Sequence, residues 1–106
     1  MNDGLRGLLG LAMRAGQVLP GAGRVLDLIR QGQAGLILLD EGASDNTRKR
    51  FDDACAHHDT DCLLLSPGLL GEAIGRHGTM VAAMRPGSFT QKLLSASVRD
   101  DIRTRE

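Results

Sequence analysis

The chain is 106 residues long, 42% of them apolar and 25% charged, and its 13 basic and 13 acidic residues leave no formal net charge. This length and composition fit one globular domain, and the charge balance excludes a protein that coats nucleic acid through a global positive field. No apolar run approaches the ~18 residues of a membrane span and no signal-peptide pattern opens the chain, so we expect no membrane partner. Two cysteines are too few for a disulfide framework and suit a reducing cytoplasm. We therefore expect a cytoplasmic protein, and a monomer.

The first 40 residues alternate helix with strand. Apolar residues at helical spacing predict a first helix over residues 5–15, and Gly16 is placed to end it. A very short strand is expected at residues 17–19, followed by a second amphipathic helix over residues 25–32. The continuous apolar run of residues 35–40 then predicts a strand that is covered on both faces.

The next segment predicts a third helix. Ser44 can cap its first turn, and Asp45 lies favourably near its positive end. Helical spacing places the buried face of this helix toward the sheet. The residues expected on that buried stripe are Phe51, Ala54, Cys55 and His58.

The last elements follow the same alternation. Residues 62–66 predict a second buried strand, and Ser66-Pro67 is typical of a cap followed by the first residue of a helix, here one that ends at Gly75. Residues 79–84 predict a third full strand, and Ser88 can cap a final helix that reaches Ala96.

Helices that alternate with short apolar strands predict an α/β fold. We expect a three-layer α-β-α sandwich around a mixed sheet of about four strands. Residues 1–97 should form this single domain. Residues 98–106 are polar and are expected to be a frayed C-terminal tail.

The segment Gly21-Ala22-Gly23, directly before the second helix, raises the question of a phosphate site. A dinucleotide fingerprint would need a third glycine where this chain has Leu26, and no Gly-Lys-Ser/Thr follows. Nucleotide binding is therefore not supported. What remains is either a tight strand-to-helix turn or an anion-binding helix start, where free backbone N–H groups lie beside Arg24.

The candidate metal ligands are Cys55, His57, His58 and Cys62, but their spacing fits no standard zinc site. Cys55 and His58 share the predicted buried stripe, and Cys62 opens a buried strand, so core packing explains them better. The sequence also lacks a nucleophile elbow and any plausible catalytic triad. We therefore expect no metal, no cofactor and no enzymatic activity.

Basic residues are unevenly distributed along the chain. Residues 51–75 carry five acids and no basic residue, so an anionic partner should meet the first and last thirds. The densest cluster, residues 47–50, is either a solvated helix face, supported by pairs such as Asp45/Lys49 and Lys49/Asp53, or a set of phosphate contacts. The phosphate contacts would be Arg48, Lys49 and Arg50.

The aromatic residues exclude one class of RNA-binding protein. The chain has only Phe51 and Phe89, and both fall on predicted buried stripes. Proteins that stack single-stranded bases on exposed rings are therefore excluded. If this chain binds RNA, it must recognise a folded shape through loops, backbone and arginines.

The most specific short motifs in the chain are "LLGLAMRAG" at residues 8–16, "ASDNTRKR" at residues 43–50 and Leu70-Gly71-x-Ala73-x-Gly75. In order and spacing, from Leu5 to Leu94, they resemble the YlxQ-type bacterial branch of the L-seven-Ae / L-thirty-e ribosomal-protein family. The resemblance implies an α-β-α sandwich and binding of structured RNA, ribosomal RNA among the candidates. It also implies a fused or neighbouring nucleic-acid-binding domain in some relatives.

The resemblance also implies where RNA would bind. In the family, RNA contacts the loop and first turn of the second helix, here residues 20–27, together with residues 41–44 and residues 75–78. The glycines before the second helix would then form the floor of an RNA site. The residues assigned to RNA binding are Arg14, Gly21, Ala22, Gly23, Arg24, Asp27, Glu41, Gly75, Arg76 and His77.

The family's kink-turn motif, Gly-Ala-Asn-Glu-Val-Thr-Lys, is incomplete in this chain. Gly23 stands at the Asn, Arg24 at the Glu and Asp27 at the Lys. RNA remains the expected partner, but kink-turn specificity does not follow. The alternative is a protein-interaction module that keeps the fold and has lost the RNA site. If Arg14, Arg24 and Arg76 do not share a face with the Gly21 loop, the case for RNA binding weakens badly.

Overall fold

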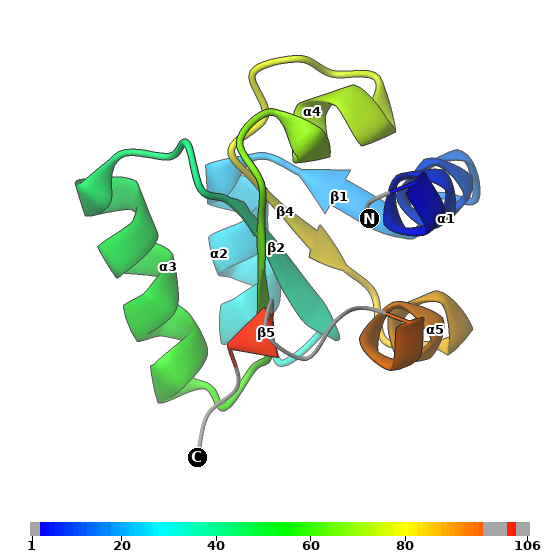
Figure 1. Cartoon of the computed structure of the whole chain (residues 1–106). Helices are drawn as coiled ribbons and strands as arrows, with labels where there is room; N and C mark the ends of the chain where they lie inside the picture. Colours follow the sequence, from blue (N-terminus) through cyan, green and yellow to red (C-terminus); the bar gives the residue numbers. More distant parts are fainter. Residues whose placement is uncertain (1–2, 97–101, 104–106) are drawn as a thin grey trace.

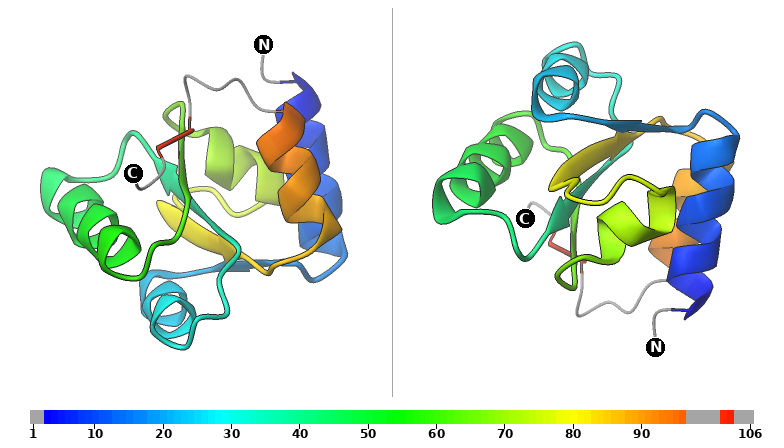
Figure 2. Two further views of the ribbon diagram at one scale, coloured as in Figure 1. Left: turned by 90° about the horizontal axis from the view of Figure 1, so that it is seen from below. Right: turned by 90° about the horizontal axis from the view of Figure 1, so that it is seen from above.

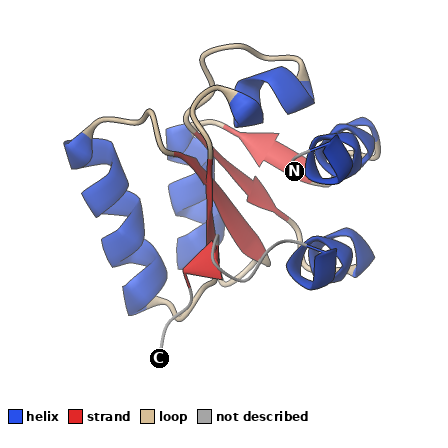
Figure 3. Cartoon of the chain, in the orientation of Figure 1, coloured by secondary structure: helices blue, strands red, loops and turns tan. Residues whose placement is uncertain are grey.

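The structure is a computed structural model that describes residues 3–96 and 102–103. Figure 3 shows the helices and strands alternating along the chain, as the sequence predicts. The elements in chain order are α1 (Asp3–Arg14), β1 (Val18–Pro20), α2 (Ala22–Arg30), β2 (Leu36–Asp40), α3 (Asp45–His57), β3 (Cys62–Leu65), α4 (Leu69–Ile74), β4 (Val81–Met84), α5 (Ser88–Ala96) and β5 (Ile102–Arg103).

Within the described residues the strands form one mixed sheet in the order β1-β4-β2-β3-β5. β2 and β3 are parallel, whereas β4 is antiparallel to both β1 and β2. The carboxyl ends of β1, β2 and β3 therefore lie at the same edge of the sheet, beside the start of β4. We name this the loop edge; it carries residues 21–22, 41–44, 66–68 and 75–80.

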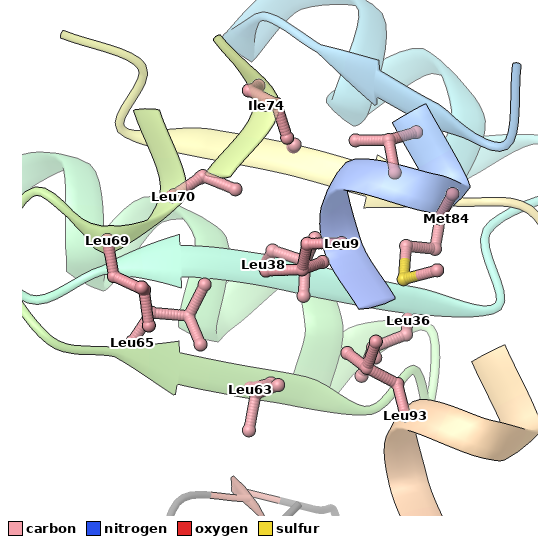
Figure 4. Close-up of a cluster of buried hydrophobic side chains, with 13 residues drawn as sticks. Leu9, Leu36, Leu38, Leu63, Leu65, Leu69, Leu70, Ile74, Met84 and Leu93 are labelled. Atoms are coloured by element: carbon pink, nitrogen blue, oxygen red, sulfur yellow. The ribbon is translucent and has the colours of Figure 1, made fainter. Parts of the chain in front are cut away.

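The three predicted layers are confirmed. Figures 1 and 2 show α2 and α3 on one face of the sheet and α1, α4 and α5 on the other. β2 is buried along its whole length, and its side chains alternate between the two faces. Leu36 and Leu38 join the core beneath α1, α4 and α5, and Ile37 and Leu39 join the core beneath α2 and α3. Figure 4 shows the first of these cores, which includes Leu9 of α1 and Leu38 of β2.

Several predicted helix ends are confirmed, although Ser88 is the first residue of α5 rather than its cap. Ser44 caps α3, since its hydroxyl oxygen accepts a hydrogen bond from the Thr47 amide at 3.1 Å. Gly16 and Gly75 follow α1 and α4 with φ of 74° and 75°, in the left-handed region where glycine is favoured. The helix ends that the sequence predicts correctly are therefore those that depend on local side-chain and backbone chemistry.

The predicted start of α4 is wrong. The helix begins at Leu69 rather than after Ser66, and its N-cap is Gly68 with φ of 84°. The Ser66 carbonyl instead accepts a hydrogen bond from the Leu69 amide at 3.0 Å, which closes a turn. This turn forms because the Gly68 amide is directed to the side chain of Asp40, far away in sequence.

Two further expectations need correction. His58 is exposed instead of buried, because α3 ends at His57 and His58 is its C-cap, at the start of the turn that leads into β3. In the expected frayed tail, Ile102 and Arg103 form β5, antiparallel to β3; the rest of residues 98–106 lies outside the described residues. None of the described helices is long and apolar enough to cross a membrane.

Candidate nucleic-acid interface

The loop edge is organised around the buried carboxylate of Asp40, the last residue of β2. Its side chain is 0% exposed. Oδ1 accepts a hydrogen bond from the Gly42 amide at 2.6 Å and Oδ2 accepts one from the Gly68 amide at 2.8 Å. The Asp40 amide donates to the Met80 carbonyl at 2.8 Å. One residue thus joins the loops that follow β2 and β3 to the segment that precedes β4.

The turn that carries Arg76 packs directly on Gly71 of α4. The Arg76 amide donates to the Gly71 carbonyl at 2.8 Å, and the Arg76 carbonyl accepts from the Thr79 amide and hydroxyl at 3.2 and 2.7 Å. A Cβ at position 71 would lie 2.8 Å from the Arg76 carbonyl oxygen. Only glycine lets the turn approach α4 this closely, so the glycine helps to fix the backbone of Arg76.

The start of α2 presents unpaired backbone donors. Its N-cap, Gly21, has φ of 113° and supplies no side-chain cap, and the first turn contains no acidic residue. The Gly21 amide donates to the Val81 carbonyl at 3.2 Å, which fixes the loop to β4. The amides of Ala22, Gly23 and Arg24 have no carbonyl partner within α2, since a helix leaves its first N–H groups unsatisfied. They lie at the positive end of the helix.

A groove of about 420 Å³ lies between these segments. It brings together the start of α2, the first turn of α3 and the turn after α4, and Arg76 is the one charged residue among its described lining. With the positive end of α2 beside it, the groove suits an anion. The described lining residues are Pro20, Gly21, Ala22, Thr47, Arg76, Gly78, Thr79, Met80 and Val81.

The structure brings most of the sequence-assigned site residues to this edge. Gly21, Ala22 and Arg76 line the groove, and Glu41, Gly75 and His77 are exposed in the loops beside it. Gly23, Arg24 and Asp27 lie on the exposed face of α2, opposite the buried Val25, Leu26, Leu28 and Ile29.

Arg14 is not at the loop edge. It ends α1, before β1, whereas Gly21 follows β1. The backbones of the two residues therefore lie at opposite ends of that strand, which counts against a face shared by Arg14 and the Gly21 loop and weakens this part of the RNA-site assignment.

The basic cluster at the start of α3 is mostly paired with acids. Arg48 lies 2.9 Å from Asp45, and Lys49 lies 3.3 Å from Asp53. The predicted Lys49/Asp53 pair is confirmed, whereas Asp45 pairs with Arg48 instead of Lys49. The guanidinium of Arg50 lies 5.9 Å from the centre of the Phe51 ring. These contacts favour a solvated helix face for Arg48 and Lys49.

Several residues that shape the groove were not assigned from the sequence. These include Thr47, Thr79 and Met80, which are part of its lining. The role of Asp40 could have been recognised from the sequence, because a buried acid at the end of a continuous apolar strand needs a hydrogen-bonding partner. Among the described residues, no group of three or more His, Cys, Asp or Glu side chains could hold a metal ion.

Taken together, the structure shows a three-layer α/β protein in which loops and helix starts gather around a groove at one edge of the sheet. Comparison with known sequences then places it: the chain belongs to the ribosomal protein L7Ae/L30e/S12e/Gadd45 family, whose sequence model matches residues 3–93.

Two bacterial relatives carry the name RNA-binding protein YlxQ. The one from Bacillus subtilis (strain 168) is 39% identical over 89 residues, which is 83% of this chain and 89% of the relative. The one from Enterococcus faecium is 33% identical over 81 residues, which is 72% of this chain and 79% of the relative. These names describe RNA binding and no catalytic activity.

Solved structures show the same fold. A protein of unknown function from Bacillus halodurans superposes with a TM-score of 0.80 at 33% sequence identity, covering 85% of this chain and 92% of that chain. The Giardia lamblia 15.5kD RNA binding protein superposes with a TM-score of 0.70 at 19% identity, covering 86% of this chain and 78% of that chain. Because the sequence identity to the second structure is only 19%, this similarity shows a shared fold alone.

The role of Asp40 predicts a large loss of stability for Asp40→Asn. The amide NH₂ of the new side chain would face one of the two backbone donors, so one hydrogen bond is lost in a buried position. We expect the free energy of unfolding to fall by about 1–3 kcal/mol in urea denaturation. The matched control, Asp53→Asn, removes a surface ion pair and should change it by less than about 0.5 kcal/mol. Equal effects of the two variants would contradict this role.

The packing of Gly71 predicts that Gly71→Ala displaces the Arg76 turn. The added methyl group must push backbone atoms aside, which should cost about 1–3 kcal/mol of stability and shift the amide NMR signals of Arg76, His77 and Gly78. Gly7→Ala is the control, since a Cβ there meets no atom within 4 Å and should stabilise α1 by about 0.5–1 kcal/mol. A Gly71→Ala variant with unshifted turn signals would disprove the close approach.

Proposed function

We propose that the protein binds structured RNA at the loop edge. The observation that supports this most is the groove in which the uncapped start of α2 lies beside Arg76, with no acidic residue among its described lining. An RNA phosphate would accept hydrogen bonds from the first amides of α2 and from the guanidinium group.

The distribution of unpaired cations supports the same edge. In the described part of the chain, no ion pair involves Arg24 or Arg76, and both are exposed. Arg48 and Lys49, by contrast, already have carboxylate partners. We assign phosphate contacts first to Arg24 and Arg76. Arg50, which has no ion pair among the described residues, is a further contact if the RNA reaches α3.

The mode of recognition follows from the aromatic residues. Phe51 is 0% exposed and Phe89 is half-buried in the core. Neither ring offers a platform on which a single-stranded base could stack. The RNA would therefore be recognised through its folded shape, by backbone amides, hydroxyls and arginines.

The names of the bacterial relatives, which describe RNA binding, support this function. We propose ribosomal RNA as the first candidate among structured RNAs, and a neighbouring nucleic-acid-binding domain as a companion. A protein-interaction module is less well supported, because Leu11 of α1, 51% exposed, is the one large exposed hydrophobic side chain among the described residues. Protein interfaces usually centre on larger apolar or aromatic anchors.

The loop-edge site predicts that Arg76→Ala weakens RNA binding. The RNA would be the fragments recovered by crosslinking the protein in cells, titrated by fluorescence anisotropy. Loss of one charged phosphate contact should reduce affinity about tenfold or more. The wild-type slope of log K against log salt should be about −2 to −4, and the variant's slope should be smaller by about 1.

Arg85→Ala is the matched control. Arg85 is exposed and follows β4, at the edge of the sheet opposite the loop edge. We expect the RNA affinity of the Arg85→Ala variant to remain within about twofold of wild type, because the charge of Arg85 is too distant to contact RNA bound in the groove. Equal losses for both variants would place the RNA elsewhere, and a salt-independent wild-type affinity would contradict the phosphate contacts.

The residues on the exposed face of α2 predict weak binding to a standard kink-turn RNA. Gly23 has no side chain to reach a base edge, Arg24 cannot accept a hydrogen bond from a guanine amino group, and Asp27 repels the phosphate backbone. Each lost base contact costs about 1–3 kcal/mol. We expect affinity at least two to three orders of magnitude below that of a relative with the intact motif, measured by calorimetry.

The triple variant Gly23→Asn, Arg24→Glu, Asp27→Lys supplies the converse test. It places the family's polar groups on the same exposed face of α2, and it should gain kink-turn affinity without loss of stability. Tight kink-turn binding by the unmodified protein would show that these three positions do not control specificity.

A further inference from the structure

The second feature of the chain with distinctive chemistry is its pair of cysteines. Both are free thiols, and each is 2% exposed. Cys55 lies near the end of α3 and Cys62 is the first residue of β3, and both belong to the core between α3 and the sheet. They belong to the same buried cluster, and the Cys62 side chain is close enough to Cys55 to influence its pKa. The only two cysteines of the sequence are thus brought together across two layers.

The local chain fixes this contact. The Thr60 amide donates to the Cys55 carbonyl at 2.9 Å, so the chain turns back directly from the end of α3 into β3. Asp59 occupies the left-handed region with φ of 55°, which lets the turn close within a few residues. Ile37 of β2 is the register partner of Cys62, which fixes the strand position. Both cysteines are therefore held by backbone structure.

The surroundings influence how readily Cys55 ionises. The hydrogen bond from Cys62 lowers the pKa of the Cys55 thiol. Burial and the nearby carboxylates of Asp52 and Asp61 act in the opposite direction, but the net effect is a lower pKa. Thiol–disulfide exchange proceeds through the thiolate, so a lowered pKa at Cys55 favours reaction at this pair.

We propose that Cys55 and Cys62 are a modification site that forms a reversible intrachain disulfide on reaction with a small disulfide such as oxidised glutathione. The Cys55 thiolate attacks one sulfur of the reagent, forming a mixed disulfide and releasing one glutathione thiolate. Cys62 then loses its proton and attacks the Cys55 sulfur, which releases the second glutathione. Two protein thiols are oxidised and one small disulfide is reduced to two thiols.

The reagent reaches the pair by local opening of the turn that joins α3 to β3. Residues 57–59 of this turn are exposed, and helix ends and turns open at lower free energy than core strands. The pair lies at the start of β3, away from the loop edge at the other end of that strand. The proposal is therefore independent of RNA binding, and the two hypotheses can be tested separately.

The test equilibrates the native protein in a glutathione redox buffer, then quenches with acid and alkylates any free thiols. We expect the intact mass to fall by two hydrogens, no alkylation, and a peptide map that joins the Cys55 and Cys62 peptides. Dithiothreitol should restore both thiols. Two alkylated cysteines, a glutathione adduct that persists at one cysteine, or a disulfide between two chains would overturn the proposal.

A second measurement separates a native site from chance proximity along the chain. The same equilibrium is measured in concentrated urea, where only the short spacing favours the bond. A prearranged pair should form its disulfide at least about tenfold more favourably in the folded protein, and oxidation should raise the melting temperature by about 5–10 °C. An equal or smaller constant in the folded state, or a lower melting temperature, would show that the fold opposes the bond.

Cys55→Ser and Cys62→Ser are the chemical controls. Each keeps one thiol and should stop at a glutathione adduct, without the cross-linked peptide. The wild-type measurements decide the proposal even if a serine variant is too unstable to purify. A cross-linked peptide map in either variant would overturn the assignment.

Discussion

The buried carboxylate of Asp40 is the interaction on which the loop edge depends. A carboxylate with no exposed surface is tolerated only when its oxygens are hydrogen-bonded, and here both oxygens accept backbone amides. Because the two donors come from the loops after β2 and β3, satisfying one side chain also determines how two connections leave the sheet. The backbone of Asp40 in turn holds Met80, at the entry to β4.

The groove follows from that arrangement and from the direction of the strands. β1, β2 and β3 all end where β4 begins, so α2, α3 and the turn after α4 meet at one edge. Helices that follow these strands start there, and their positive ends are collected on one side of the molecule. A chain with no net charge can in this way present a local site for an anion, without the global positive field that its composition excludes.

The sequence predicts the features that depend on local chemistry. Apolar periodicity identifies the layers, Ser44 identifies the start of α3, and Gly16 and Gly75 identify two helix ends. Prediction from the sequence fails where a residue far away in the chain determines the local structure. Ser66 is a plausible cap, but the amide of Gly68 is held by Asp40, 28 residues earlier, and the helix starts later. The groove could not be predicted for the same reason, because Thr47 and Thr79 are brought to one groove only by the strand order.

This division between fold and site explains how the chain can keep its family's architecture while its kink-turn motif is incomplete. The core residues of α2, Val25, Leu26, Leu28 and Ile29, are buried against the sheet, and substitution there would cost the cavity penalty of a packed interior. Gly23, Arg24 and Asp27 are exposed on the opposite face, where most substitutions change stability little. The residues that would contact bases are therefore free to vary independently of the fold. The backbone features of the groove are not, because the positions of Gly21 and Arg76 are fixed by hydrogen bonds to Val81 and Gly71. RNA contacts made through backbone and shape should therefore persist in this fold longer than contacts that read particular bases.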